Sequence, residues 1–252
     1  MTDRSDAHTA VLPLTGRRAI VSGGSTGIGR AIAVLLASEG AHVFIGGSRQ
    51  AHVDDALARI GEVGRGDGVA IDLAREDNVS TFVDRAKEAL GGVDIVVANA
   101  AIGAGGLTEM DEAGVREAVS LNFTHYLLLA QRAAVEMPAG GDIVLIGSMS
   151  AYVLGPHSTV YAGIKQGVQG VSVALRRELG PKGIRVALVE PGMTGSDMQL
   201  PDLPPEKQRA LIAEEKMLRA EDIAVGVHFL LTQPRRTVIQ RLTISPRVQD
   251  EE

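Results

Sequence analysis

The chain has 252 residues, of which 45% are hydrophobic and 22% charged, and its formal net charge at pH 7 is −6. This length and balance are typical of a globular domain with a sizeable core. The acidic charge and the lack of any Lys or Arg run give no support for nucleic-acid binding, so we expect no nucleic-acid partner. The chain has no cysteine, which excludes disulfides and thiolate metal sites and suits the reducing cytoplasm, where we expect the protein to act.

Two segments bear on targeting and membranes. Residues 1–13 contain no apolar stretch of signal-peptide length, so they predict a flexible N-terminal tail before a domain at 14–252. Residues 143–164 carry no Asp, Glu, Lys or Arg, which raises the question of a membrane span. Glycines, serines and a proline interrupt this stretch too often for a stable apolar helix, so we expect no membrane partner.

Short apolar runs alternate with segments of helical periodicity along the chain. The expected strands cover residues 17–24, 41–47, 68–73, 93–100, 141–147, 184–192 and 238–244. The expected helices cover residues 28–40, 50–63, 76–91, 111–137 with a break near Asn122, 158–180 and 220–232. Because the strands are nearly all apolar, the pattern predicts one α/β domain of the doubly wound Rossmann type. Its seven-stranded parallel sheet would be covered by helices on both faces.

The longest segment without a clear period is 193–217, which contains three prolines in "LPDLPP". It follows the end of a strand, where open α/β sheets bind their ligands. We expect an irregular loop that contacts the substrate.

The sequence "SGGSTGIG" at 22–29 places Gly23, Gly27 and Gly29 between the first strand and the first helix. Residues without Cβ let backbone N–H groups and the helix N-terminus approach a pyrophosphate. A ligand-free glycine turn is the alternative, because glycine accounts for 30 of the 252 residues. The position of the cluster, after a strand and before a helix, favours nucleotide binding.

The sequence "YAGIK" places Tyr161 and Lys165 one helical turn apart, on the same face of a helix. At about 4 Å and an effective dielectric constant near 20, their attraction would be roughly 4 kcal/mol. This would lower the pKa of Tyr161 from about 10 by up to roughly 3 units, toward the working pH. Tyr161 could then donate or accept a proton, and Ser148, which follows an apolar strand, could hold the same substrate oxygen. A solvated turn serine is the alternative for Ser148.

These motifs together resemble the short-chain dehydrogenase/reductase family, in its single-domain branch, over residues 16–246. Residues 22–29 match the family's Thr-Gly-x-x-x-Gly-x-Gly turn, with Ser22 in place of Thr. The family's Asn-Asn-Ala-Gly becomes Ala-Asn-Ala-Ala at 98–101, and its Pro-Gly-x-Ile-x-Thr stretch resembles 191–196. Asn122, Ser148, Tyr161 and Lys165 fall at the family's catalytic positions.

The resemblance implies an oxidoreductase that moves a hydride between a nicotinamide cofactor and a small carbonyl compound or secondary alcohol. In the family the lysine also binds the nicotinamide ribose, and the asparagine holds a water in a proton relay. Those roles fall on Lys165 and Asn122. The cofactor-binding residues that it implies are Gly23, Ser25, Thr26, Gly27, Ile28, Gly29, Ser48, Arg49, Asp72, Leu73, Asn99, Ala100, Ala101, Tyr161, Lys165, Pro191, Gly192, Thr194 and Ser196. No metal is expected.

The second expected strand ends without a carboxylate, which favours NADP(H) while leaving NAD(H) possible. In this fold an acidic residue there binds the adenosine ribose diol, and Gly47 occupies the place where NAD-dependent relatives carry Asp. Ser48 and Arg49 could hold a 2′-phosphate by charge-assisted hydrogen bonds. The alternative is that Arg49 points into water. Thr26 stands where many NADP-dependent relatives have a basic residue, and Asp72 would contact the adenine of either cofactor.

Two other functions on related folds remain open. A nucleotide-sensing protein without turnover is one, although it would not need Tyr161 and Lys165. A methyltransferase is the other, and it would leave Ser148 and the tyrosine–lysine pair unexplained. The segment 193–217 lacks an arginine cluster, so we expect a neutral, partly apolar substrate. The helices around 121–137 and 158–180 carry apolar or small residues that predict a homotetramer or homodimer.

Overall fold

The computed structural model describes residues 11–152, 154–200 and 202–248. Within these ranges seven strands form one sheet in the order β3-β2-β1-β4-β5-β6-β7, and all neighbouring strands are parallel. The strands are β1 (Arg18–Ser22), β2 (His42–Gly47), β3 (Arg65–Ala70), β4 (Ile95–Ala98), β5 (Asp142–Ile146), β6 (Arg185–Pro191) and β7 (Arg241–Ile244). The order reverses between β1 and β4, and this fold binds ligands beyond the carboxyl ends of the strands at that point.

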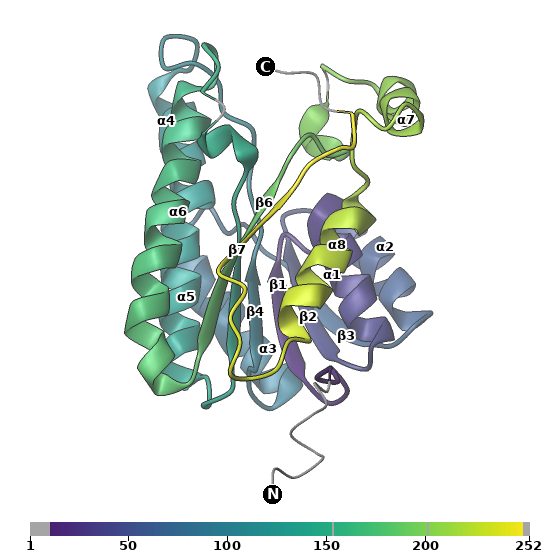
Figure 1. Ribbon diagram of the computed structural model, residues 1–252, viewed down its shortest axis with the longest axis vertical. Helices are drawn as coiled ribbons and strands as arrows, with labels where there is room; N and C mark the ends of the chain where they lie inside the picture. Colours follow the sequence, from purple (N-terminus) through teal and green to yellow (C-terminus); the bar gives the residue numbers. More distant parts are fainter. Residues whose placement is uncertain (1–10, 153, 201, 249–252) are drawn as a thin grey trace, which may run out of the picture.

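Helices cover both faces of this sheet (Figure 1). One face carries α1, α2 and α8, and the other carries α3, α5 and α6, with α4 packed against α6. The helices are α1 (Gly27–Ser38), α2 (Gln50–Gly61), α3 (Glu76–Leu90), α4 (Glu112–Val119), α5 (His125–Glu136), α6 (Thr159–Leu179), α7 (Pro205–Ala213) and α8 (Ala220–Leu231). The predicted doubly wound α/β fold is confirmed.

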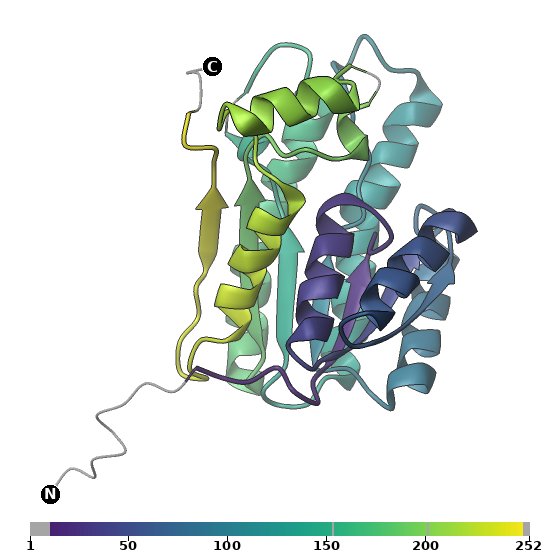
Figure 2. The same cartoon turned by 90° about the vertical axis from the view of Figure 1, so that its right-hand side faces the viewer.

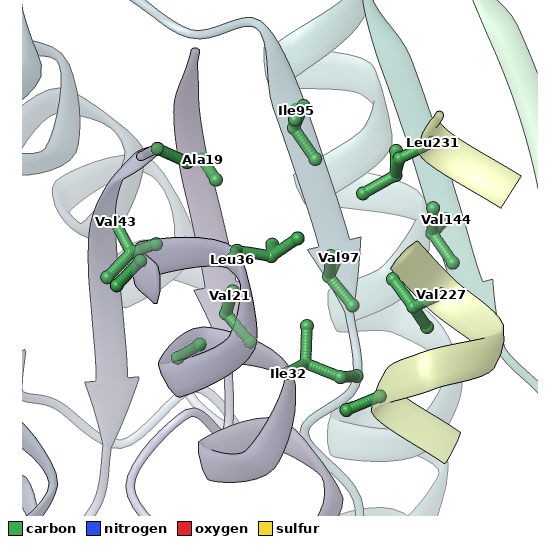
Figure 3. Close-up of a cluster of buried hydrophobic side chains, with 14 of the residues drawn as sticks. Ala19, Val21, Ile32, Leu36, Val43, Ile95, Val97, Val144, Val227 and Leu231 are labelled. Carbon is green, nitrogen blue, oxygen red and sulfur yellow. The ribbon is translucent and has the colours of Figure 1, made fainter. Parts of the chain in front are cut away.

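Two cores lie on the two sides of the sheet. Val21 packs with Ile32 of α1 and Val227 of α8 in one core, part of which is drawn in Figure 3. The preceding residue, Ile20, points to the other core, where it meets Phe82 of α3. Successive residues of a strand point to opposite faces, so a sheet buried on both sides needs apolar residues throughout. This explains why the strands read as continuous apolar runs.

Two expected boundaries were wrong. The third strand was expected at 68–73, but β3 begins at Arg65 and ends at Ala70. Its sequence, RGDGVA, has two glycines and no fully buried residue, because β3 lies at the edge of the sheet. The segment 193–217 is also less irregular than expected, because it contains α7, which lies beyond the carboxyl ends of the strands (Figure 2). The proline pair that suggested a loop starts this helix, since Pro205 is its first residue and proline suits that position.

The break expected near Asn122 is confirmed. A π-helical turn, Ser120–Thr124, separates α4 from α5. The uncharged stretch 143–164 forms β5, a loop with a short 3₁₀ turn, and the start of α6. Along the described parts of the chain, no helix has both the length and the apolar character needed to cross a membrane.

Most of the predicted N-terminal tail, residues 1–10, lies outside the described residues. The backbone N–H of Leu12 donates to Thr232 O at 2.8 Å, and Leu14 is buried in the core under α1. The part of the predicted tail nearest the domain is therefore attached to the end of α8.

Candidate active site

The glycine turn between β1 and α1 is packed so closely that side chains are excluded. Gly23 has φ +63° and Gly27 has φ +50°, a backbone region that favours glycine. A Cβ on Gly29 would lie 2.1 Å from Gly23 O, and one on Gly23 would lie 2.8 Å from Ala100 Cα. A larger residue at Gly23 or Gly29 would therefore force the backbone of the turn to move. It leads directly into the N-terminus of α1, where partial positive charge favours an anion.

Residues directly after β4, the strand beside β1, form hydrogen bonds to this turn. Asn99 donates its Nδ2 hydrogens to Ser22 O at 3.0 Å and Gly23 O at 3.2 Å. The backbone N–H groups of Asn99 and Ala100 donate to the Ser22 hydroxyl oxygen at 2.9 and 3.2 Å. Ser22, which only the family motif had marked, is fully buried and joins the two strand ends. The Asn99 side chain therefore has a clear structural role in shaping the turn.

The end of β2 lies beside the same turn. A Cβ on Gly47 would lie 2.2 Å from Ser25 Oγ and 2.6 Å from Ser25 Cβ, so Gly47 and the buried Ser25 exclude larger residues from each other's place. Ser48 and Arg49 follow in the exposed start of α2. Within the described ranges, neither of these two side chains takes part in a hydrogen bond or ion pair. Thr26 occupies the N-cap position of α1, and its side chain makes no capping bond.

Asp72 and Leu73 differ in their surroundings. Leu73 is buried in the core that α3 covers. Asp72 is exposed after β3, and its carboxylate accepts a hydrogen bond from Ala74 N at 3.0 Å. Asp72 is thus placed at the carboxyl edge of the sheet, while Leu73 presents its side chain to the core.

Ser148 and the tyrosine–lysine pair come from two neighbouring elements. Ser148 follows β5 and caps a short 3₁₀ turn by accepting a hydrogen bond from Ser150 N at 3.1 Å. Tyr161 and Lys165 lie one turn apart near the start of α6, with the Lys165 ammonium 5.6 Å from the centroid of the Tyr161 ring. Lys165 is 1% exposed, whereas Tyr161 is partly exposed. The helix therefore buries the ammonium behind the phenol.

The expectation of a lowered tyrosine pKa was wrong for the protein without ligands. Burial raises the pKa of Tyr161 to about 12, and the neighbouring Ser148 hydroxyl opposes this only in part. Burial also lowers the pKa of Lys165 to about 7. The sequence-based prediction treated both charges as if they lay in a uniform medium, whereas in the fold desolvation disfavours the phenolate of Tyr161 and the ammonium of Lys165 alike.

Asn122 lies within the π-helical turn and is fully buried. Its carboxamide accepts a hydrogen bond from Ile102 N at 2.8 Å and donates one to Ile102 O at 2.7 Å. These bonds hold the segment that follows β4, which also carries Asn99. The Asn122 side chain is therefore committed to the backbone of a neighbouring loop.

A cleft of about 660 Å³ opens beyond the carboxyl ends of the strands. The predicted site residues that line it are Ile28, Asn99, Ala101, Ser148, Tyr161, Lys165, Pro191, Gly192, Thr194 and Ser196. Those that do not line it are Gly23, Ser25, Thr26, Gly27, Gly29, Ser48, Arg49, Asp72, Leu73, Ala100 and Asn122. The cleft joins the first residues of α1 to the serine, tyrosine and lysine. Most of the glycine turn and the end of β2 do not line this cleft.

The segment 193–217 forms the other wall. The predicted contacts Thr194 and Ser196 are held by short-range bonds: Thr194 Oγ1 donates to Gly192 O at 2.9 Å, and Ser196 N donates to Gln208 Oε1 at 3.0 Å. Gln208, on α7, also donates to Ser196 O and Leu203 O. Sequence reasoning missed Gln208, and the pattern of one amide in a polar helix gave no signal for it.

Several other residues also line the cleft. Gln199, Leu203, Lys207, Leu211 and Lys216 belong to the segment 193–217 that was expected to contact the substrate, whereas the remaining ones were not expected: Gly103, Ala104, Ile146, Gly147, Met149, Ser150, Pro246 and Val248. Most belong to loops after strands, so only the predicted sheet edge could have pointed to them. Met193 and Met198, which belong to the same segment 193–217, also line the cleft. Among the described residues, no group of histidines and carboxylates has the arrangement of a metal site.

Comparison with curated proteins gives relatives across nearly the whole chain. An uncharacterized oxidoreductase of Staphylococcus aureus (strain MRSA252) is 28% identical over 239 residues, which cover 92% of this chain and 98% of the relative. Glycine betaine reductase ATRR of Emericella nidulans is 34% identical over 247 residues, or 93% of this chain, but only 19% of that longer protein.

Solved structures agree with this result. A short-chain dehydrogenase of Burkholderia cenocepacia J2315 in complex with NADP has a TM-score of 0.83 and 36% identity, covering 92% of this chain and 98% of the other. A blue fluorescent protein from a metagenomic library, in complex with NADPH, has a TM-score of 0.82 and 28% identity, covering 93% and 98%. The sequence profile described as "short chain dehydrogenase" matches residues 17–206. The chain therefore belongs to the short-chain dehydrogenase/reductase family of oxidoreductases.

Proposed function

We propose that the protein transfers a hydride between NADP(H) and a small carbonyl compound or secondary alcohol, with Tyr161 as the general acid/base. The observation that carries this proposal is the shared cleft. Ser148, Tyr161 and Lys165 line it together with Ile28, the second residue of α1. The residues that would handle a proton therefore face the same space as the helix that would receive a dinucleotide.

The glycine turn fits the pyrophosphate of such a cofactor. A Cβ on Gly23 or Gly29 would collide with neighbouring atoms of the chain, so glycine at these two positions is needed for the shape of the turn. The N-terminus of α1, directly after it, favours a negatively charged group. NADP(H), when bound, supplies or accepts the hydride.

The remaining chemistry belongs to the chain itself. With a pKa raised to about 12, Tyr161 is protonated at neutral pH and suits donation of a proton to a carbonyl oxygen. The Ser148 hydroxyl beside it can hold the same oxygen. The Lys165 ammonium favours the phenolate that remains after proton transfer, because an opposite charge nearby stabilises the charged form. In the oxidation of an alcohol the same groups would act in reverse.

The end of β2 supports NADP(H) over NAD(H). None of the three residues at this strand end, Gly47, Ser48 and Arg49, is acidic, so no carboxylate there would repel a 2′-phosphate. Arg49 is exposed at the start of α2, with its guanidinium available for a phosphate. Two of the related structures contain NADP or NADPH.

The lining of the cleft supports a small, partly apolar substrate. Met193, Met198, Leu203 and Leu211 line the side formed by the segment 193–217. Lys207 and Lys216 line the same side, and their positive charge would also tolerate an acidic group. A substrate screen should therefore pair neutral ketones with matched oxo acids.

We further propose that the protein assembles through α5 and α6 as a homodimer or homotetramer. Leu127, Val135 and Val173 are exposed on these two helices. A Cβ on Gly163 or Gly170 of α6 would find no neighbour within 4 Å, so this part of the helix is open to a partner. Sedimentation at micromolar concentration tests this proposal, and a monomer there would refute it.

The direct test of the proposed reaction is to mix the protein with NADPH or NADH and a panel of ketones and oxo acids. Oxidation of the reduced nicotinamide, followed by its absorbance, is expected with NADPH and at least one carbonyl compound. Cofactor binding without turnover across the panel would favour the alternative of a nucleotide-sensing protein. Binding of S-adenosylmethionine in place of NADPH would favour a methyltransferase.

A further inference from the structure

The Lys165 ammonium is buried without a counter-charge. It donates hydrogen bonds to Ile146 O at 2.9 Å and to the Tyr126 hydroxyl oxygen at 3.4 Å. Along the described parts of the chain, no carboxylate forms an ion pair with it, and no Asp or Glu lines the cleft that it faces. A buried ammonium without a carboxylate depends on dipoles and aromatic faces to remain charged.

Tyr126 supplies both kinds of contact. Its ring centroid lies 5.1 Å from Lys165 Nζ, closer than the centroid of the Tyr161 ring at 5.6 Å. Its hydroxyl donates to Ile146 O at 3.1 Å, so the lone pairs of that hydroxyl are free to accept from Lys165. The three groups form a closed triangle: Lys165 and Tyr126 both donate to Ile146 O, and Tyr126 accepts from Lys165.

Tyr126 lies directly after the π-helical turn, in the first turn of α5. Asn122, inside the turn, and Tyr126, one helical turn later in α5, lie on the same buried face. Ile146 is the last residue of β5, two residues before Ser148. The triangle therefore connects α5, β5 and α6 directly behind the residues that face the cleft.

Two side chains of α5 that lie near Lys165, Tyr126 and His125, are both neutral near pH 7. Burial raises the pKa of Tyr126 well above its usual value, so it acts as a phenol and not as a phenolate. His125, beside Tyr126 on α5, has its pKa lowered to about 4 by burial and, to a smaller extent, by the Lys165 charge, so it is neutral near pH 7. Burial lowers the pKa of Lys165 to about 7, and the loss of one favourable contact would therefore change its charge at working pH.

We propose that Tyr126 is a positioning residue that holds the Lys165 ammonium charged and in place behind Tyr161, through its hydroxyl and its ring. The proposal rests on the function proposed above for Lys165. Tyr126 acts on the reaction through the lysine and does not itself touch the reacting atoms.

The test is the titration of Lys165 in the Tyr126→Phe variant. The chain has five lysines, so NMR of lysine labelled with ¹³C at Cε, assigned with Lys165→Met, resolves the Lys165 signal in the protein without substrate. The Phe variant keeps the ring and removes the hydroxyl. We expect the titration midpoint of Lys165 to fall by about one pH unit, because a hydrogen bond to a charged group contributes about that much.

The matched control is Tyr152→Phe. Tyr152 Oη donates to Thr243 Oγ1 at 3.4 Å, away from Lys165, so its loss should leave the lysine midpoint unchanged. In turnover assays, kcat/KM should fall as Lys165 loses its proton. The pH at which this fall occurs should be lower in Tyr126→Phe than in the wild-type protein and unchanged in Tyr152→Phe. An unchanged Lys165 midpoint in folded Tyr126→Phe overturns the proposal.

A second measurement avoids dependence on the folding of that variant. In the wild-type protein labelled at tyrosine Cζ, only three tyrosine signals are expected. Lys165→Met should shift the Tyr126 signal and leave Tyr152 in place, and equal shifts at the two would overturn the proposal. Both NMR experiments give an answer even if no substrate is turned over, so their failure is distinct from failure of the proposed reaction.

Discussion

The two walls of the cleft are held by different kinds of contact. On the cofactor side, the glycine turn is fixed by backbone atoms and by Asn99, with no room for a Cβ on Gly23 or Gly29. On the proposed substrate side, one amide, Gln208, bonds to Ser196 and Leu203 within the segment 193–217, and the side chains that line the cleft there include exposed methionines. The first wall is expected to tolerate almost no change, and the second to accept change with moderate effects.

Gly29→Ala should have the largest effect, because it tests the tighter wall. Its Cβ would lie 2.1 Å from Gly23 O, which forces the turn to move. We expect NADPH affinity to fall by about a hundredfold or more, and unfolding to become easier by about 1–3 kcal/mol, the usual effect of overpacking. Calorimetric titration with NADPH and denaturant unfolding measure the two effects.

The control is Gly61→Ala at the end of α2, where a Cβ would have no neighbour within 4 Å. It should preserve NADPH binding and leave stability equal or slightly improved. If Gly29→Ala bound NADPH as tightly as this control, the steric account of the turn would be wrong.

Arg49→Ala tests the outer border of the cofactor side. Removal of the guanidinium should reduce the NADPH-over-NADH ratio of kcat/KM by about tenfold or more, the value of one charge-assisted hydrogen bond. Arg59→Ala, on the same helix but paired with Asp55, is the control and should leave the ratio unchanged. A wild-type preference for NADH would refute the assignment.

Arg49→Ala is a cleaner substitution than an aspartate at Gly47. A Cβ there would lie 2.2 Å from Ser25 Oγ, so Gly47→Asp would mix a steric effect with its charge.

Gln208→Ala tests the looser wall. The variant loses the bonds to Ser196 and Leu203, so the segment 193–217 should adopt a wider range of positions. We expect the substrate KM to rise several-fold while the NADPH dissociation constant changes little, together with about 1–3 kcal/mol of lost stability from the unpaired backbone groups. The exposed Arg209 of α7, changed to Ala, should alter neither constant. Equal losses of cofactor and substrate binding would show that the two walls are not independent.

The pH dependence of stability provides a further test, at the buried His125 of α5. Burial lowers the pKa of His125 to about 4 from its ordinary 6.5. The unfolded chain therefore binds a proton more readily, so the stabilising contribution is complete above pH 6.5 and is lost as the pH falls toward 4. It amounts to about 3 kcal/mol at most. His125→Leu should flatten unfolding free energy over that interval, while the partly exposed His52, changed to Leu, should not.

Features that depend on local sequence patterns could be predicted, whereas features that depend on the folded structure could not. The alternation of strands and helices, the glycine turn and the Ser148–Tyr161–Lys165 spacing depend on local patterns, and sequence reasoning found them. Tyr126 acts through contacts with elements distant in the chain, and Gln208 through bonds to Ser196 and Leu203 in its own segment; neither residue has a local sequence signal. The helix α7 was missed because prolines suggest a loop when their position in a helix is unknown. The direction of the Tyr161 pKa was wrong because burial of that phenol is a property of the fold.

The central claim is that Tyr161 carries the proton while the glycine side holds the cofactor. Tyr161→Phe, assayed with NADPH and a carbonyl compound that the wild-type protein reduces, tests it most directly. We expect turnover to fall by about 10²- to 10⁴-fold, the usual contribution of a general acid, with the NADPH dissociation constant unchanged within about twofold. Turnover near the wild-type rate in the folded Phe variant would contradict the account.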